Sequence, residues 1–160
     1  SPRGGEGRPP MPNGGGRPAF DPAQAGSLAI RLGGSGDVTA SHVVWKAPKV
    51  TAGYASPVVE EGLAYFVNRV GGVQCVDLAT GEVRWQHRLP GSAWASPVIV
   101  DGNVFFFCKD GAVVVLKAGP TLEEVGENTL SSTDVVYGVA AVEGAWLVRT
   151  GRGLIKIAVE

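Results

Sequence analysis

From Ser27 onward the chain alternates short apolar runs with glycine-containing turns. The runs are rich in Val, Ile, Phe, Tyr and Trp, and many of them end at an Asp-Gly or Glu-Gly pair. This pattern is typical of β-strands joined by tight turns. No window sustains a helical period, and the nearest candidate, 121–125, is short, ends at Gly126 and is explained at least as well as the start of a strand. The hydrophobic pattern therefore predicts an all-β domain.

The same pattern recurs about every forty residues along the chain. The positions that match at an offset of forty are Ala55–Val59 with Ala95–Ile99, Glu61-Gly62 with Asp101-Gly102, Gly71 with Gly111, Tyr54 with Trp94, and Trp45 with Trp85. A third copy follows at an offset of forty-two, in which Glu143-Gly144 takes the place of Asp101-Gly102. So many matches in register indicate a structural repeat.

Each unit is predicted to fold as four strands. The predicted strands are 54–59, 62–67, 73–78 and 82–89 in the first full unit, 94–100, 103–108, 112–117 and 124–130 in the second, and 136–142, 145–149 and 153–158 in the third. Residues 41–46 are expected to form the last strand of a preceding unit, and 27–32 an earlier strand. Four short strands per forty-odd residues is the period of a β-propeller blade. The sequence therefore predicts a partial β-propeller of four-stranded antiparallel blades, two of them complete and two partial.

The repeat also predicts how the chain divides. Residues 1–26 hold seven of the 24 glycines and six of the 11 prolines, a composition that predicts a flexible segment or loop insert. The remaining residues are predicted to form propeller blades: a partial blade 27–50, blades 54–91 and 92–132, and a blade 133–160 that lacks its last strand. Because propellers close with four to eight blades, we expect the chain to be the C-terminal part of a longer propeller.

One string carries a family resemblance. Residues 75–85, Cys-Val-Asp-Leu-Ala-Thr-Gly-Glu-Val-Arg-Trp, closely resemble the tryptophan-docking repeat AxDxxTGxxxW of pyrroloquinoline-quinone-like (PQQ-like) propellers. Asp77, Thr80, Gly81 and Trp85 match this repeat, and Cys75 replaces its small first residue. The segment 29–39, followed by Trp45, is also similar to a stretch found in many bacterial PQQ-like repeat proteins of the cell envelope.

The resemblance implies a structural docking motif made of Asp77, Thr80, Gly81, Trp85 and Trp45. In such propellers the tryptophan packs between neighbouring blades, while the Asp and Thr hold the turn that positions it. The second unit departs from the pattern, because Lys117 stands where Asp77 stood and no tryptophan follows in its fourth strand. We therefore expect other packing to hold that blade.

The composition of the chain argues against a nucleic-acid partner and against a membrane span. Fourteen Lys and Arg against fifteen Asp and Glu leave a net charge of −1, without the excess of positive charge that nucleic-acid binding requires. No apolar run approaches the roughly 20 residues of a membrane span. Two cysteines cannot form a framework of several disulfides. We therefore predict neither a nucleic-acid partner nor a membrane span.

The reactive side chains show no catalytic or metal-binding spacing. Cys75 and Cys108 occupy non-equivalent places in adjacent units, and a buried inert thiol explains each better than a redox pair does. His42 and His87 are predicted on outer strands, with no Asp or Ser at a spacing typical of a catalytic triad. The sequence therefore predicts no catalytic, cofactor-binding or metal-binding residue in this chain.

Three charged or glycine-rich stretches receive the same structural interpretation. Adjacent residues of a strand point to opposite faces, so the pairs Glu60-Glu61 and Glu123-Glu124 are predicted to be solvated acids that share no substrate. Gly33–Asp37 lacks the Lys-Ser/Thr of a phosphate loop and is predicted to be a plain loop. Arg149 and Arg152 could dock an anionic partner, but a solvated turn is the favoured interpretation.

The resemblance implies a function class as well. Proteins of this kind, among them outer-membrane assembly lipoproteins of the BamB type, imply a non-catalytic scaffold that binds a protein partner, or the remaining propeller blades, outside the cytoplasm in the bacterial periplasm or cell envelope. The alternative is a fragment of a PQQ-dependent quinoprotein dehydrogenase. The vicinal disulfide, calcium ligands and aspartate base of such an enzyme would then lie outside this chain, which has no Cys-Cys pair. A third alternative is the sensor half of a larger multidomain protein, such as an envelope-facing kinase.

Overall fold

The computed structural model describes residues 26–131 and 134–158, which form strands in four antiparallel sheets and one short helix. The predicted flexible segment, apart from Gly26, lies outside the described residues. The first sheet pairs β1 (Ser27–Ile30) with β2 (Val43–Ala47), and helix α1 (Thr39–His42) lies between them in the chain. The other sheets consist of β3 (Val58–Glu60), β4 (Leu63–Val67), β5 (Gly72–Asp77) and β6 (Val83–Arg88); of β7 (Val98–Val100), β8 (Asn103–Phe107), β9 (Ala112–Lys117) and β10 (Glu124–Thr129); and of β11 (Val136–Val142), β12 (Ala145–Thr150) and β13 (Leu154–Ala158).

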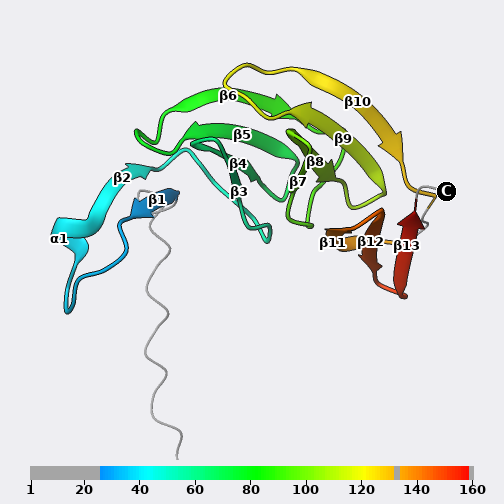
Figure 1. The fold of residues 1–160 in the computed structure, drawn as a ribbon, viewed down its shortest axis with the longest axis horizontal. Coiled ribbons are helices and arrows are strands. Elements are labelled where there is room, and N and C mark those ends of the chain that lie inside the picture. Colours follow the sequence, from blue (N-terminus) through cyan, green and yellow to red (C-terminus); the bar gives the residue numbers. More distant parts are fainter. Residues whose placement is uncertain (1–25, 132–133, 159–160) are drawn as a thin grey trace, which may run out of the picture.

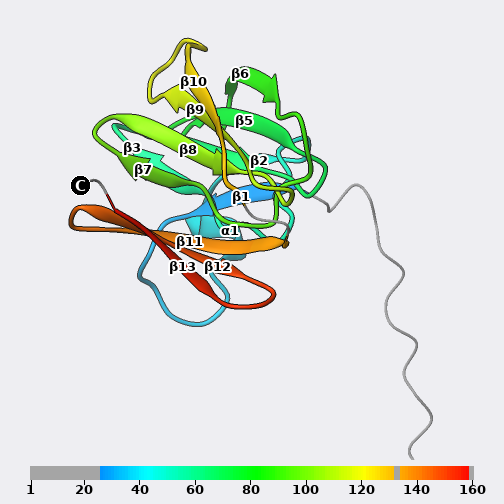
Figure 2. The ribbon, with the colours of Figure 1, turned by 90° about the vertical axis from the view of Figure 1, so that its right-hand side faces the viewer.

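The sheets follow one another along an arc in chain order, with β3 and β7 on the concave side and β6 and β10 on the convex side (Figure 1). Within each sheet, neighbours in the chain are also neighbours in space. The turned view shows the β11–β13 sheet stacked beside the β7–β10 sheet (Figure 2). This is the arrangement of propeller blades, so the predicted partial β-propeller is confirmed.

The first hairpin of each complete blade has the turn chemistry that its sequence predicts. Glu61 and Gly62 have φ angles of 46° and 79°, and Asp101 and Gly102 have φ angles of 50° and 69°. Two successive residues with positive φ match the twist of the flanking strands, which is why an acidic residue followed by glycine closes these hairpins.

The prediction of a strand over 41–46 is wrong at its start. Ser41 and His42 belong to α1, and the strand begins only at Val43. The Asp37 carboxylate accepts the N–H of Thr39 at 3.0 Å, which favours a helical first turn. The β-branched Val43 and Val44 then return the chain to the extended form. His42 therefore lies at the end of a helix and not on an outer strand.

The core consists of apolar layers between successive sheets. All five residues of β4 are buried, because its alternate side chains face opposite neighbours. Ala64 and Phe66 pack toward Ala47 at the end of β2 and Val50 in the link that follows, whereas Tyr65 packs with residues of the third sheet such as Phe106. A blade therefore buries its two faces only with a blade on each side.

At the interface between the third and fourth sheets, the tryptophan belongs to the following sheet and not to the preceding one. No tryptophan lies on β10, but Trp146 of β12 packs back onto the third sheet, with its ring centroid 4.8 Å from Phe105 and 5.6 Å from Phe107. Val113, Val136 and Val148 complete this layer.

The packing of Trp146 generates a prediction on stability. Trp146→Ala should lower the free energy of unfolding by about 2–4 kcal/mol, because it removes apolar contacts and leaves a gap between two sheets. Trp94→Ala is the matched control, since Trp94 belongs to none of the buried clusters, and it should cost less than half as much. Urea unfolding of the full chain measures both, and equal losses would contradict the assignment of Trp146 to the interface.

Candidate functional site

Two tryptophans connect successive sheets through their indole N–H groups. Nε1 of Trp45 donates to the carbonyl of Leu78 at 2.8 Å, and Nε1 of Trp85 donates to the carbonyl of Gly119 at 2.9 Å. Each bond runs from the last strand of one sheet into the turn between the last two strands of the next. The two indoles thus combine apolar filling with a directional bond to a neighbouring turn.

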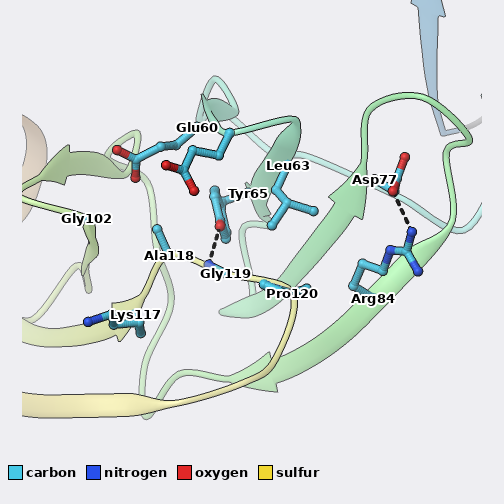
Figure 3. Close-up of a pocket in the computed structure, with 11 residues that line it drawn as sticks. Glu60, Leu63, Tyr65, Asp77, Arg84, Gly102, Lys117, Ala118, Gly119 and Pro120 are labelled. Atoms are coloured by element: carbon cyan, nitrogen blue, oxygen red, sulfur yellow. Dashed lines mark hydrogen bonds and ion pairs between the residues drawn. The ribbon is translucent and has the colours of Figure 1, made fainter.

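Gly119 is held by both of its backbone groups. Its N–H donates to the hydroxyl oxygen of Tyr65 at 2.7 Å (Figure 3). Its carbonyl accepts from Trp85. Burial raises the pKa of Tyr65 to about 12, so the phenol stays protonated at neutral pH. The rings of Tyr65 and Trp85 lie 5.9 Å apart. Both side chains belong to the preceding blade, so the two blades are held together at this turn.

The turn beneath Trp45 is organised by Asp77. Its Oδ1 accepts the N–H groups of Ala79 and Thr80 at 2.8 and 3.1 Å, and its Oδ2 accepts a bond from Arg84 at 2.6 Å. The Arg84 guanidinium, together with the Ala79 amide, lowers the pKa of this carboxyl. Gly81 follows with φ at 78°, directly against the Trp45 ring. On this geometry we propose that the turn forms a platform for the indole of the preceding sheet.

A pocket of about 390 Å³ opens beside Gly119, at the end of the blades where the first and third hairpin turns lie (Figure 3). Glu60 and Glu61 both line it, so the prediction that they face opposite sides is wrong. The reason is that β3 ends at Glu60 and Glu61 is already a turn residue with φ at 46°. Oε2 of Glu60 is buried and has no hydrogen-bond partner among the described residues.

The other predicted side chains are dispersed. His87 lies on β6, with Nε2 3.9 Å from Oε2 of Glu124 on β10, while Glu123 is exposed in the preceding turn. His42 contacts the neighbouring Ser41 hydroxyl at 2.7 Å. Gly33–Asp37 forms an exposed loop without regular structure. The structure therefore does not bring the two histidines together.

A row of aromatic rings crosses the opposite end of the blades. It consists of Tyr54, Trp94 and Tyr137, and we call it the aromatic row. The centroids of Tyr54 and Trp94 lie 5.8 Å apart, and those of Trp94 and Tyr137 lie 5.6 Å apart. Tyr54 is 70% exposed and Tyr137 40% exposed. Each ring lies in or beside the link that leads into the first strand of its blade, which brings the rings together from three sheets.

Cations cover two rings of this row. Nζ of Lys109 lies 4.5 Å above the Trp94 ring, and the Arg149 guanidinium lies 5.6 Å from the Tyr137 ring. Both distances are in the range of cation–π attraction. Sequence reasoning matched Tyr54 with Trp94 as a repeat but missed the surface that they form. The missed signal is a basic residue fifteen positions after each ring: Arg69, Lys109 and Arg152.

Comparison with known proteins agrees with this fold. The family model described as outer membrane protein assembly factor BamB matches residues 34–121, more than half of the chain. The chain belongs to this family.

Solved structures give the same fold for the BamB-family chain. BamB from Moraxella catarrhalis is 16% identical, with a TM-score of 0.61 over 72% of this chain and 36% of that one. The quinohemoprotein alcohol dehydrogenase from Comamonas testosteroni is 20% identical, with a TM-score of 0.52 over 62% and 17%. The WD40 β-propeller domain of Doa1 is 16% identical, with a TM-score of 0.56 over 71% and 39%.

These likenesses at low identity show the β-propeller fold and no activity. The BamB-family chain spans about a third of the length of the Moraxella BamB structure. No curated protein matches its sequence. No helix in the described ranges is long and apolar enough to cross a membrane.

The quinoprotein neighbours raise the question of a quinone with calcium. In the described parts of the chain, no three His, Cys, Asp or Glu side chains lie close enough to hold a metal ion. Cys75 lies on β5 and Cys108 directly after β8, both buried and unpaired, so they form no vicinal disulfide. The described residues therefore do not fit this group, and under the dehydrogenase alternative its ligands would belong to other parts of the protein.

The contact between Gly81 and Trp45 generates a second prediction. An added Cβ at Gly81 would lie 2.7 Å from the indole, whereas at Gly102, which has a similar φ of 69°, it would meet nothing within 4 Å. Gly102→Ala should lower the free energy of unfolding by about 1–2 kcal/mol through backbone strain alone. Gly81→Ala should cost about 1–3 kcal/mol more because of overpacking. In a Trp45→Ala background the extra loss should disappear; if it persists, the indole is not its cause.

The buried thiol of Cys75 generates a third prediction. Burial raises its pKa from 9.0 to about 11. The folded state therefore retains a proton that the unfolded state loses, and this contribution to stability is complete below pH 9 and lost as the pH rises through 11. Urea unfolding from neutral to alkaline pH should show stability falling less steeply in Cys75→Ala than in the native chain. Equal slopes would show that Cys75 ionises as easily when folded.

Proposed function

We propose that this chain is part of a non-catalytic propeller scaffold that binds a protein partner in the bacterial cell envelope. The observation that carries the proposal is the aromatic row, an exposed surface made of rings from three successive blades. Aromatic and basic residues are the types that contribute most to binding at protein interfaces. The role from which the family takes its description, outer membrane protein assembly, supports an envelope location and a binding role.

Rigid connections between the blades support the same proposal. The bonds from Trp45, Trp85 and Tyr65 join neighbouring blades, and the hydroxyl of Ser96 accepts the N–H of Ser56 at 2.9 Å across the starts of β3 and β7. A surface shared by several blades keeps its shape only if the blades do not move against one another. A preorganised surface loses less entropy when it binds.

The dehydrogenase alternative receives less support from the residues present. Its structural neighbours share the fold at 18–20% identity. The two thiols are buried and separate, and the Cys75 pKa is raised, which disfavours the reactive thiolate. The scaffold is therefore the function that we propose.

Site-directed photocrosslinking tests the scaffold. Tyr54 and Tyr137 are replaced one at a time by a photoreactive phenylalanine in cells that produce the full protein. The control position is Leu122, which is 43% exposed on a turn at the other end of the blades. We expect a crosslinked protein from positions 54 and 137 and none from Leu122, because only the first two lie on the proposed surface. Crosslinks of equal yield from all three positions would contradict the proposal.

A second arm tests the enzyme alternative in the same protein. Purified full-length protein is titrated with PQQ and Ca²⁺ and assayed for dye-linked oxidation of alcohols and sugars. The scaffold predicts no saturable absorbance change and no activity. Saturable binding with turnover would replace the scaffold by the dehydrogenase.

A further inference from the structure

The same aromatic and basic pair recurs at one end of three successive blades. An aromatic ring lies in or beside the link that enters the first strand, and a basic residue follows fifteen positions later in the turn between the second and third strands. The pairs are Tyr54 with Arg69 and Trp94 with Lys109. In the third blade Gly151 takes the place of Lys109, and Arg152 follows one position later, fifteen after Tyr137. In the third blade Arg149, at the end of β12, supplies the cation that lies over the ring.

The three rings contact one another across the blades but lie outside the buried layers. None of the three belongs to the buried clusters that fill the layers between the sheets. The turns that carry the cations are nevertheless fixed. The Lys109 N–H donates to the carbonyl of Ser92 and its carbonyl accepts from Val136, while Gly151 donates to the carbonyl of Val135. Turns held in place in this way keep their basic residues beside the exposed rings, which favours the binding of a partner.

Charge is divided between the two ends of the blades. The hairpin turns of β3–β13 at the pocket end carry five acidic residues: Glu61, Glu82, Asp101, Glu123 and Glu143. The basic residues at this end are Arg31, in the loop between β1 and β2, and Arg84 and Lys117, on strands that line the pocket. The turns and links at the end of the aromatic row carry Lys49, Arg69, Lys109 and Arg152. The net charge of −1 does not reveal this difference in charge between the two ends.

Two acids also lie at the basic end, and both are engaged with backbone. The Asp110 carboxylate accepts the N–H of Ala112 at 3.4 Å, and the Asp134 carboxylate accepts the N–H of Val135 at 2.8 Å. Both carboxylates keep their negative charge, but the cations at this end outnumber them, so the net field at the aromatic row attracts an anionic partner. These cations are Lys49, Arg69, Lys109, Arg149 and Arg152.

We infer that the aromatic row binds an extended acidic peptide segment of the protein partner. The inference rests on the proposed scaffold function and names the chemistry that its surface recognises. Neighbouring rings are 5.6–5.8 Å apart, close to the roughly 6.6 Å between alternate side chains of an extended chain. Carboxylates at alternate positions of such a segment would meet the cations of successive blades, and the side chains between them would contact the rings.

The tilt of the rings favours a peptide over a nucleic acid or a polyanionic sugar. Stacking of bases needs free, flat ring faces. The Tyr54 and Trp94 planes are 74° apart and those of Trp94 and Tyr137 are 54° apart, so the row presents notches and no continuous platform. Lys109 already covers one face of Trp94. Side chains of an extended segment fit such notches better than planar groups do.

Fluorescence anisotropy tests this inference. The probe is a short fluorescein-labelled peptide that alternates Glu and Thr, compared with the same peptide carrying Gln in place of Glu. The protein is the full chain, and three variants are compared with it. The first is a triple variant that combines Lys109→Gln, Arg149→Gln and Arg152→Gln. The second is Trp94→Ala, and the third is the control Lys117→Gln at the other end of the blades. We expect the triple variant to lose at least about tenfold in affinity and Trp94→Ala severalfold, with added salt weakening the native complex. The control should stay within about twofold.

Each outcome decides the inference. The inference is wrong if the Gln peptide binds as tightly as the Glu peptide, or if Lys117→Gln loses as much affinity as the triple variant. It is also wrong if heparin or single-stranded DNA binds the native chain more tightly than the Glu peptide does. Urea unfolding of each variant separates lost binding from lost folding. If crosslinks arise at positions 54 and 137 but the Glu peptide does not bind, the scaffold stands and the acidic partner is wrong. If the peptide binds and those crosslinks are absent, the scaffold itself is wrong.

Discussion

The structure depends on the burial of each blade against its neighbours. A four-stranded sheet such as β3–β6 is apolar on both faces, as the five buried residues of β4 show, so it has no face to turn toward water. Apolar contact alone would allow sheets to slide, because the hydrophobic effect has no direction. The indole bonds of Trp45 and Trp85 supply that direction, since each joins a large apolar ring to one carbonyl of the next sheet. Successive blades are thereby fixed in angle as well as in contact.

That fixed angle creates the two ends of the molecule. In an antiparallel sheet that follows chain order, alternate turns lie at opposite ends, so residues far apart in sequence gather by turn number. The acidic hairpin turns gather at the pocket, and the basic ones gather at the aromatic row. Because the repeat of about forty residues places one aromatic residue and one basic residue at the same end of each blade, successive blades together form a surface. In this way a chain of nearly zero net charge acquires mainly acidic turns at one end of its blades and mainly basic turns at the other.

Much of the fold could be predicted because the signals are local and repeated. Acidic-Gly turns, period-two apolar runs and the motif around Asp77 each specify structure within a few residues, and the repeat confirms one copy by another. Local signals also caused the errors. Ser41 and His42 are predicted to be strand because an apolar run follows them, but they belong to a short helix whose first residue, Thr39, donates to Asp37. The side chains of Glu60 and Glu61 are predicted to point to opposite faces of a strand, because the sequence does not locate the end of β3 to one residue.

The sequence by itself determined the class of fold, the number of strands in each unit and the residues that form the turns. These depend on short-range backbone preferences and on the alternation of apolar residues. Only the tertiary structure decided which side chains meet across blades: Tyr65 with Gly119, Trp146 with Phe105, and the three rings of the aromatic row. These contacts depend on the rotation of one sheet relative to the next. Packing of whole faces sets that rotation, and no single segment of the sequence encodes it.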